Sequence, residues 1–172
     1  MSKVTWKPGT LLAPVPAVMV SCGTMEKPNI ITIAWTGIVN SDPAMTYISV
    51  RRERFSHALI SKSGEFVLTT SALSRATDLC GVKSGRDTDK FALANLTPEP
   101  ASKLSCPMIV QSPLSLECKV TQVLPLGSHD MFLAKIIAVN VEESLLDEKG
   151  KLHLSRCGLL SYAHGEYFAQ GR

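Results

Sequence analysis

The chain of 172 residues has the length of one ordinary domain, and we predict a single domain over residues 1–172. Its 18 basic and 15 acidic residues give a formal net charge of +3, which is too balanced for binding nucleic acid through bulk charge. Beyond the N-terminal stretch considered next, no apolar run approaches the 18 residues that a membrane-spanning helix needs, so we expect no membrane association.

The first apolar stretch, Leu11–Val20, follows two lysines and therefore has the charge pattern of an export signal. Pro14 and Pro16 interrupt the helix that such a signal requires. The same residues continue into a strand pattern over Val15–Cys22, which favours a first β-strand over a leader segment.

The cysteines are odd in number and widely scattered, without a CxxC pair or the spacing of metal ligands. They are Cys22, Cys80, Cys106, Cys118 and Cys157. We therefore predict reduced thiols in a cytoplasmic protein, with no metal site.

Further strand patterns follow along the chain, each an apolar or β-branched run bounded by turn signals. They cover Ile30–Trp35, Thr46–Val50, Phe66–Thr70, Leu114–Val123 and Met131–Val141. One more candidate, Leu159–Phe168, is interrupted by His164 and Gly165, which indicates a hairpin or a bulge.

Helical patterns are short and lie between the strands, over Ser56–Ser63, Ala72–Gly81 and Asp87–Ala94. Ser56 is a good N-cap residue for the first of them, and Gly64 a good stop. Because strands dominate without βαβ alternation, we predict a mainly β fold, an antiparallel β-barrel with peripheral helices. The proline-rich segment Asn95–Pro113 is expected to be a long surface connection or an arm that reaches a partner subunit.

Polar side chains interrupt the apolar strand pattern that begins at Asn29. Thr32 and Thr36 add hydroxyl groups, and Trp35 adds a flat indole beside them. Such a set suits a polar heteroaromatic ligand, although an aromatic residue on an apolar strand is more often part of the core or of a dimer interface.

Three arginines stand immediately before the helix that Ser56 is expected to cap. Arg51, Arg52 and Arg54 would place guanidinium groups beside the free N–H groups and the positive dipole end of that helix. A phosphate suits this arrangement, and His57 offers a further donor. The ordinary alternative is a solvated charged face. The proline turn Asp42–Met45 is expected to bring the arginine strand beside the polar strand.

Five segments, in this order, resemble segments of the flavin reductase-like family of FMN-binding split barrels, flavoredoxins included. They are LLAPVPAVMVSCG, NIITIAWTG, ISVRRERFSHALI, CGVKSGRDTDKF and GSHDMFLAKIIAV. The resemblance implies a Greek-key-like antiparallel barrel and a homodimer that binds one FMN per subunit between the barrel and the partner chain. The turn reads DPAM where the family often has two consecutive prolines.

The resemblance also implies roles for individual residues. The strand beside the flavin ring and ribityl chain would carry Asn29, Thr32, Trp35 and Thr36, and the phosphate end would carry Arg51, Ser56 and His57. Closure over the flavin is implied for Lys90 and Phe91. A catalytic position near the reacting face is implied for His129.

Two functions follow from this resemblance. One is a flavin reductase that passes electrons from NAD(P)H through FMN to an acceptor; because no GxGxxG motif is present, its nicotinamide must stack on the flavin. The other is a flavoredoxin-type carrier that holds FMN tightly and uses a protein redox partner. A third reading is a related barrel with haem or a deazaflavin, or a structural dimer; axial haem ligands would be available at His57, His129, His153 and His164.

Overall fold

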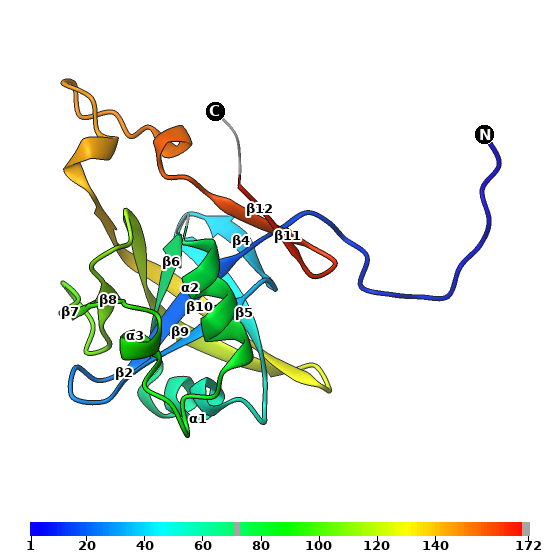
Figure 1. Cartoon of the computed structure of the whole chain (residues 1–172), viewed down its shortest axis with the longest axis horizontal. Coiled ribbons are helices and arrows are strands. Elements are labelled where there is room, and N and C mark those ends of the chain that lie inside the picture. Colours follow the sequence, from blue (N-terminus) through cyan, green and yellow to red (C-terminus); the bar gives the residue numbers. More distant parts are fainter. Residues whose placement is uncertain (71–72, 170–172) are drawn as a thin grey trace.

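The computed structural model describes residues 1–70 and 73–169. In this part of the chain a seven-stranded antiparallel sheet has the order β3-β2-β6-β9-β10-β5-β4 (Figure 1). Its strands are β2 (Val18–Gly23), β3 (Pro28–Ile33), β4 (Thr36–Ser41), β5 (Ala44–Arg51), β6 (Glu65–Thr70), β9 (Leu114–Pro125) and β10 (His129–Val141).

The sheet closes on itself through its two end strands. β3 and β4 stand at opposite ends of the strand order but are separated in sequence by only Ala34 and Trp35. The N–H of Ser49 on β5 donates to the carbonyl of Trp35 at 2.9 Å, which ties the chain just after β3 to β5, the strand next to the other end of the sheet. The prediction of a mainly β fold, an antiparallel barrel with peripheral helices, is confirmed.

Smaller elements flank the barrel. β1 (Val15–Pro16), β11 (Leu160–Ala163) and β12 (Glu166–Ala169) form a three-stranded sheet, and β7 (Pro98–Glu99) pairs with β8 (Met108–Ile109). Short 3-10 helices cover Glu143–Leu145 and Leu154–Arg156. The predicted C-terminal hairpin is confirmed: β11 and β12 pair across a turn in which His164 and Gly165 have positive φ.

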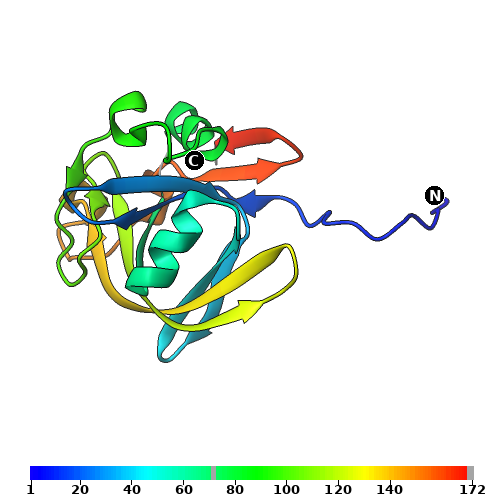
Figure 2. The ribbon, with the colours of Figure 1, turned by 90° about the horizontal axis from the view of Figure 1, so that it is seen from below.

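The α-helices are α1 (Phe55–Ser63), α2 (Ser74–Val82) and α3 (Lys90–Leu93). Figure 2 shows α1 lying between the blue β2–β3 pair and the yellow β9–β10 hairpin. α1 ends at Gly64, as predicted, with a left-handed φ of 69°. α3 is shorter than predicted because Asp89 caps it, accepting the N–H of Ala92 at 3.1 Å. Ala72, the first residue of the predicted second helix, lies outside the described residues.

β2 and β3 are buried on both faces, which explains why apolar residues predominate in both strands instead of alternating with polar ones. Val18 and Val20 point into the barrel, where they pack with Phe66 and Phe132. On the other face, Met19 and Ile30 belong to a second core beneath α2 and α3; that core also contains Ala76, Cys80, Phe91, Leu96 and Ile109. The helices therefore cover the outside of the β2–β3 pair.

β4 has no strand pattern in the sequence and was not predicted. Ile38 and Val39 on this strand are 70% and 47% exposed, so β4 has no buried apolar stripe of its own. It pairs with β5 from Thr36↔Ile48 to Ser41↔Ala44, and the proline turn joins these two strands. The expectation that the turn sets the polar strand beside the arginine strand is wrong in detail: β3 reaches β5 through the carbonyl of Trp35, at the closure of the barrel.

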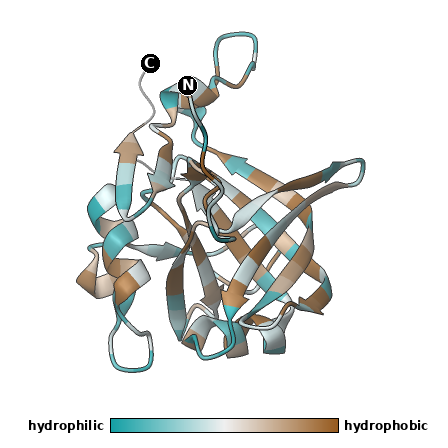
Figure 3. Ribbon diagram, turned by 90° about the vertical axis from the view of Figure 1, so that its right-hand side faces the viewer, coloured by the Kyte–Doolittle hydropathy of each residue, from teal (hydrophilic) through white to brown (hydrophobic). Residues whose placement is uncertain are grey.

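Residues 1–14 form an extended arm that leaves the barrel (Figures 1 and 2) and points toward the viewer in Figure 3. By contrast, the segment Asn95–Pro113 folds back onto the barrel. The backbone N–H groups of Ser102, Lys103 and Leu104 donate to the buried carboxylate of Glu117 at 2.8 to 3.0 Å. The segment is therefore a connection that packs on its own barrel, and its contact with a partner subunit stays a prediction. Among the described residues, no helix is both long and apolar enough to cross a membrane.

Candidate functional site

Two adjoining pockets form one groove beside β3, β5 and the start of α1. Their volumes are about 250 Å³ and about 150 Å³, and both are lined by Ile31 and Arg54. The larger pocket is also lined by Glu53, Phe55, Ser56, Lys83, Ser84, Gly85, Arg86 and Lys90. The smaller one is also lined by Thr32, Ile33, Ala34, Trp35, Ser49, Val50, Arg51 and His129. We refer to these as the cationic end and the aromatic end of the groove.

The cationic end combines a helix start with several basic side chains. Phe55 and Ser56 are the first two residues of α1, and N–H groups at that position have no partner within a helix. Arg86 donates to the carbonyl of Glu53 at 3.0 Å, which fastens the loop before α3 to the loop before α1. Helix N–H groups and guanidinium groups together favour an anion.

Lys90 lines this pocket and is otherwise buried in the fold. Its ammonium donates to the carbonyls of Ile30 at 2.7 Å and Cys80 at 2.9 Å, and the residue is 5% exposed. An ammonium has three donors, so two of them are used within the fold. Burial lowers the pKa of Lys90, and the nearby Arg54 acts in the same direction. Lys90 therefore joins β3 to α2 as well as lining the groove.

Asn29 lies behind the wall of the cationic end. Its amide donates to Ser56 Oγ at 2.7 Å, and both side chains are buried. A Cβ atom added to Gly85 would stand 1.9 Å from Asn29 Oδ1, so this position in the loop needs glycine. The prediction that Ser56 caps α1 is wrong: the N-cap residue is Arg54, no side chain caps the helix, and the buried Ser56 hydroxyl is turned toward Asn29.

At the aromatic end, the ring of Trp35 contacts the ring of His129 in a tilted arrangement. Their ring centroids are 4.3 Å apart at an angle of 42°, and Trp35 is 43% exposed. Ser128 Oγ lies 2.9 Å from His129 Nδ1. Burial, with a further contribution from the charge of Arg51, lowers the pKa of His129 and favours a neutral imidazole. A neutral imidazole beside an indole is compatible with a flat ligand ring.

The two threonines use their hydroxyl groups within the fold. Thr32 lines the groove and donates to the carbonyl of Thr77 on α2. Thr36 is buried on β4, donates to the carbonyl of Tyr47 at 2.5 Å and lines neither pocket of the groove.

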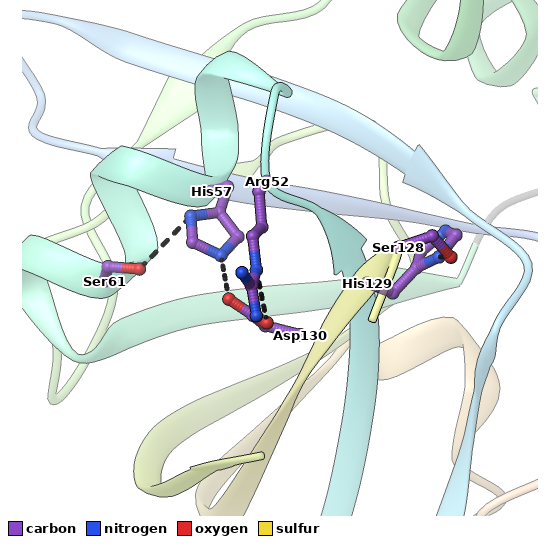
Figure 4. Close-up of polar contacts among 6 residues, drawn as sticks. All are labelled: Arg52, His57, Ser61, Ser128, His129 and Asp130. Carbon is purple, nitrogen blue, oxygen red and sulfur yellow. Dashed lines mark hydrogen bonds and ion pairs between the residues drawn. The ribbon is translucent and has the colours of Figure 1, made fainter. Parts of the chain in front are cut away.

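His57 and Phe91 also lie away from the groove lining. His57 Nε2 donates to Asp130 Oδ2 at 2.9 Å, and its ring meets the edge of Phe132 (Figure 4). Phe91 is 3% exposed within the second core. Of the sequence-predicted site residues, the structure brings six together along the groove: Thr32, Trp35, Arg51, Ser56, Lys90 and His129. Their contact with a ligand stays a prediction.

The cationic end also contains Arg54, which the sequence identified only as one of three arginines at an expected anion site, and the loop Lys83–Arg86, which lies in the family-like segment CGVKSGRDTDKF but was given no role of its own. The signal was available in that loop, where Ser84 and Gly85 stand between two cations, an arrangement that suits close approach of backbone to an anion. Asp130 was also missed, because nothing in the sequence shows that it pairs with Arg52 and His57.

Comparison with known proteins places the chain in a family. Residues 11–170 match the model of the flavin reductase like domain. The structure superimposes on flavoredoxin of Desulfovibrio vulgaris (Miyazaki F) with a TM-score of 0.91 at 30% identity, covering 99% of this chain and 94% of that one. Flavoredoxin from Methanosarcina acetivorans gives a TM-score of 0.91 at 25% identity, with 100% and 93% covered.

A further similar structure is the FMN-binding protein from Thermus thermophilus with bound 1-cyclohex-2-enone. Its TM-score is 0.81 at 26% identity, with 99% of this chain and 96% of that chain covered. The family match spans almost the whole chain. The chain belongs to the flavin reductase like family.

Proposed function

We propose that the chain is a flavoprotein that binds FMN in this groove and passes electrons through it. The observation that carries the proposal is the division of the groove into a cationic end and an aromatic end. FMN has the same division, with a phosphate at one end and a flat heteroaromatic ring at the other. The similarity to flavoredoxins and to an FMN-binding protein supports this choice of ligand.

The residues present fit the phosphate. A phosphomonoester carries about −1.5 to −2 charges at neutral pH, which one or two cations come close to balancing. Arg54, Lys83 and Arg86 line the cationic end, and the N–H groups of Phe55 and Ser56 supply donors. These groups would hold the phosphate of FMN.

The aromatic end fits a ring between an apolar wall and a polar edge. Ile31, Ile33 and Val50 form the wall, while Trp35 and His129 offer flat faces. When bound, the flavin supplies the redox chemistry: it accepts a hydride and passes electrons on one or two at a time. His129 is the residue placed to hold or exchange a proton at this end, and Trp35 orients the ring.

We propose NAD(P)H as the electron donor. Anaerobic stopped-flow mixing of the FMN-loaded protein with NADH or NADPH is expected to bleach the flavin absorbance rapidly. Absence of bleaching with both nucleotides would contradict a reductase.

A flavoredoxin-type carrier is the second candidate, favoured by the similarity to two flavoredoxins. A carrier keeps its FMN through gel filtration, whereas flavin used as a substrate at micromolar affinity, about −8 kcal/mol, washes off. The absorbance spectrum of the purified protein, followed by that of its supernatant after heat denaturation, distinguishes the two and identifies the cofactor. A haem spectrum would contradict the flavin assignment. So would a protein that contains no flavin after purification and binds none when FMN is added.

We further propose a homodimer. The arm of residues 1–14 exposes Trp6 and Leu12 by 77% and 85%, and β4 exposes Ile38 by 70%. Apolar side chains exposed to this degree are typical of contact surfaces. Light scattering after gel filtration is expected to give twice the 18.6 kDa of the chain. Deleting residues 1–12 should shift the protein toward monomer; a monomeric full-length chain would refute the proposal.

All five cysteines are free and buried, which fits a reducing cytoplasmic setting.

A further inference from the structure

A carboxylate outside the groove holds the segment that builds its cationic end. Asp130 follows His129 on β10, and consecutive side chains of a strand point to opposite faces. His129 contacts Trp35 in the groove, whereas Asp130 is 7% exposed and lines neither of the two pockets. Figure 4 shows His129 turned away from the cluster that Asp130 forms.

Asp130 binds the loop before α1 and the first turn of α1 at the same time. Its Oδ1 accepts from Arg52 Nε at 2.9 Å, and its Oδ2 accepts from His57 Nε2 at 2.9 Å. These two partners stand on either side of Arg54, the N-cap residue that lines both pockets. The segment Arg52–His57 is thereby tied at both ends to one side chain on a neighbouring strand.

His57 is itself held in place by further contacts. Ser61 Oγ lies 3.5 Å from His57 Nδ1, and the ring packs edge-on against Phe132, with 5.2 Å between the centroids. Burial alone would raise the pKa of the Asp130 carboxyl. The hydrogen bonds from His57 and Arg52 outweigh this effect and lower the pKa. Asp130 is therefore ionised at neutral pH and neutralises Arg52.

The three arginines that precede α1 therefore have different surroundings. Arg52 pairs with Asp130 beneath the loop, and Arg51 lies 3.7 Å from Glu53 at the rim. Arg54 remains as the arginine of this run that lines the cationic end. The position of Arg54 and of the first N–H groups of α1 consequently depends on how firmly the segment is held.

We propose that Asp130 is a positioning residue for phosphate binding, which holds the segment Arg52–His57 so that Arg54 and the start of α1 face the phosphate. The inference rests on the proposed function, since it concerns the phosphate end of the same groove. It assigns to Asp130 an effect on the phosphate and none on the flavin ring. Riboflavin, which has the ring without the phosphate, separates these two effects.

The test compares Asp130→Asn with Asp147→Asn. Asp147 Oδ2 also lies 2.9 Å from a histidine, His153, but in a turn that does not line the groove, so its substitution is a matched control. Each apoprotein is titrated with FMN and with riboflavin by fluorescence quenching, and its thermal unfolding is recorded. For Asp130→Asn, the FMN dissociation constant is expected to rise on the order of tenfold, comparable with one hydrogen bond to a charged group. The riboflavin constant should stay unchanged, and Asp147→Asn should change neither.

Arg52→Gln provides a second test that leaves the carboxylate and His57 in place. It is expected to weaken FMN selectively, by less than Asp130→Asn does. The inference is overturned if Asp130→Asn binds FMN like the wild type, or loses FMN and riboflavin equally. If Asp130→Asn does not fold, unchanged FMN binding by Arg52→Gln overturns it. A failure of the proposed function is distinguishable, because the wild type itself would then show no preference for FMN over riboflavin.

Discussion

Two surface segments of this barrel are held by carboxylates, and they differ in what the carboxylate binds. The connection around residues 101–105 is held by Glu117, which is fully buried on β9 and accepts bonds from Ser102, Lys103, Leu104 and Asn140. The segment Arg52–His57 is held by Asp130, which accepts from two side chains. Glu117 thus binds mainly backbone N–H groups, whereas Asp130 binds a guanidinium and an imidazole.

The difference matches the positions of the two segments. Backbone donors fix a loop whatever its side chains are, and the Glu117 connection lies outside the groove lining. Side-chain donors fix a loop while leaving its backbone N–H groups available, which an anion site requires. The Glu117 connection is therefore expected to serve stability, and the Asp130 segment to serve binding.

The largest expected effect is on stability. Glu117→Gln keeps the volume of the side chain but removes the charge that its donors share. We expect the free energy of unfolding to fall by roughly 3 kcal/mol, since several hydrogen bonds to a buried charge weaken together. Denaturant titration measures this change.

Glu65→Gln is the matched control, because Glu65 accepts from the N–H and the hydroxyl of the neighbouring Ser105 at an exposed position. Its loss should be well below that of Glu117→Gln. FMN affinity of the folded Glu117→Gln protein should equal that of the wild type; a large loss of affinity would break the division between the two segments.

The next largest effect concerns the phosphate. Arg54→Gln is expected to weaken FMN by about 1.5 to 3 kcal/mol, the range for a hydrogen bond to a charged group, while riboflavin binding changes little. Arg75→Gln, on α2 and outside the groove lining, serves as the control. Equal losses for FMN and riboflavin would contradict the assignment of Arg54 to the phosphate end.

A smaller effect is expected at the aromatic end. Trp35→Leu removes the indole that contacts His129, and it should weaken FMN and riboflavin by the same amount, about 1 kcal/mol. Calorimetric titration with both ligands measures this. A loss confined to FMN would show that Trp35 acts at the phosphate and not at the ring.

The smallest effect is a change of stability with pH. Burial raises the pKa of Glu117, but the bonds from Ser102, Asn140 and the backbone outweigh it, so its pKa lies below the ordinary value. A carboxyl whose pKa is lowered by folding stabilises the protein above its unfolded-state pKa, and this contribution is lost as the pH falls through the folded-state pKa. The difference in unfolding free energy between wild type and Glu117→Gln should therefore shrink in acid. A difference that stays constant down to pH 3 would contradict this account.

Much of the barrel could be predicted from the sequence because its strands carry apolar runs, as β2 does from Val18 to Cys22. β4 could not, because Ile38 and Val39 are exposed and its pairing with β5 is a tertiary property. At the site, Trp35 and His129 line the aromatic end, where flat side chains were expected. Arg51, which was expected at the phosphate end, lines the aromatic end instead, because it pairs with His129 across β5 and β10. His57 and Phe91 were misplaced relative to the groove, since their direction depends on Asp130 and on the second core.

The central claim is that the cationic end of the groove binds the phosphate of FMN. Titration of the wild-type apoprotein with FMN and with riboflavin, each repeated in the presence of inorganic phosphate, tests it most directly. We predict that FMN binds at least about tenfold more tightly than riboflavin, and that inorganic phosphate competes with FMN but not with riboflavin. Equal affinity for the two flavins, or FMN binding that inorganic phosphate leaves unchanged, would contradict the claim.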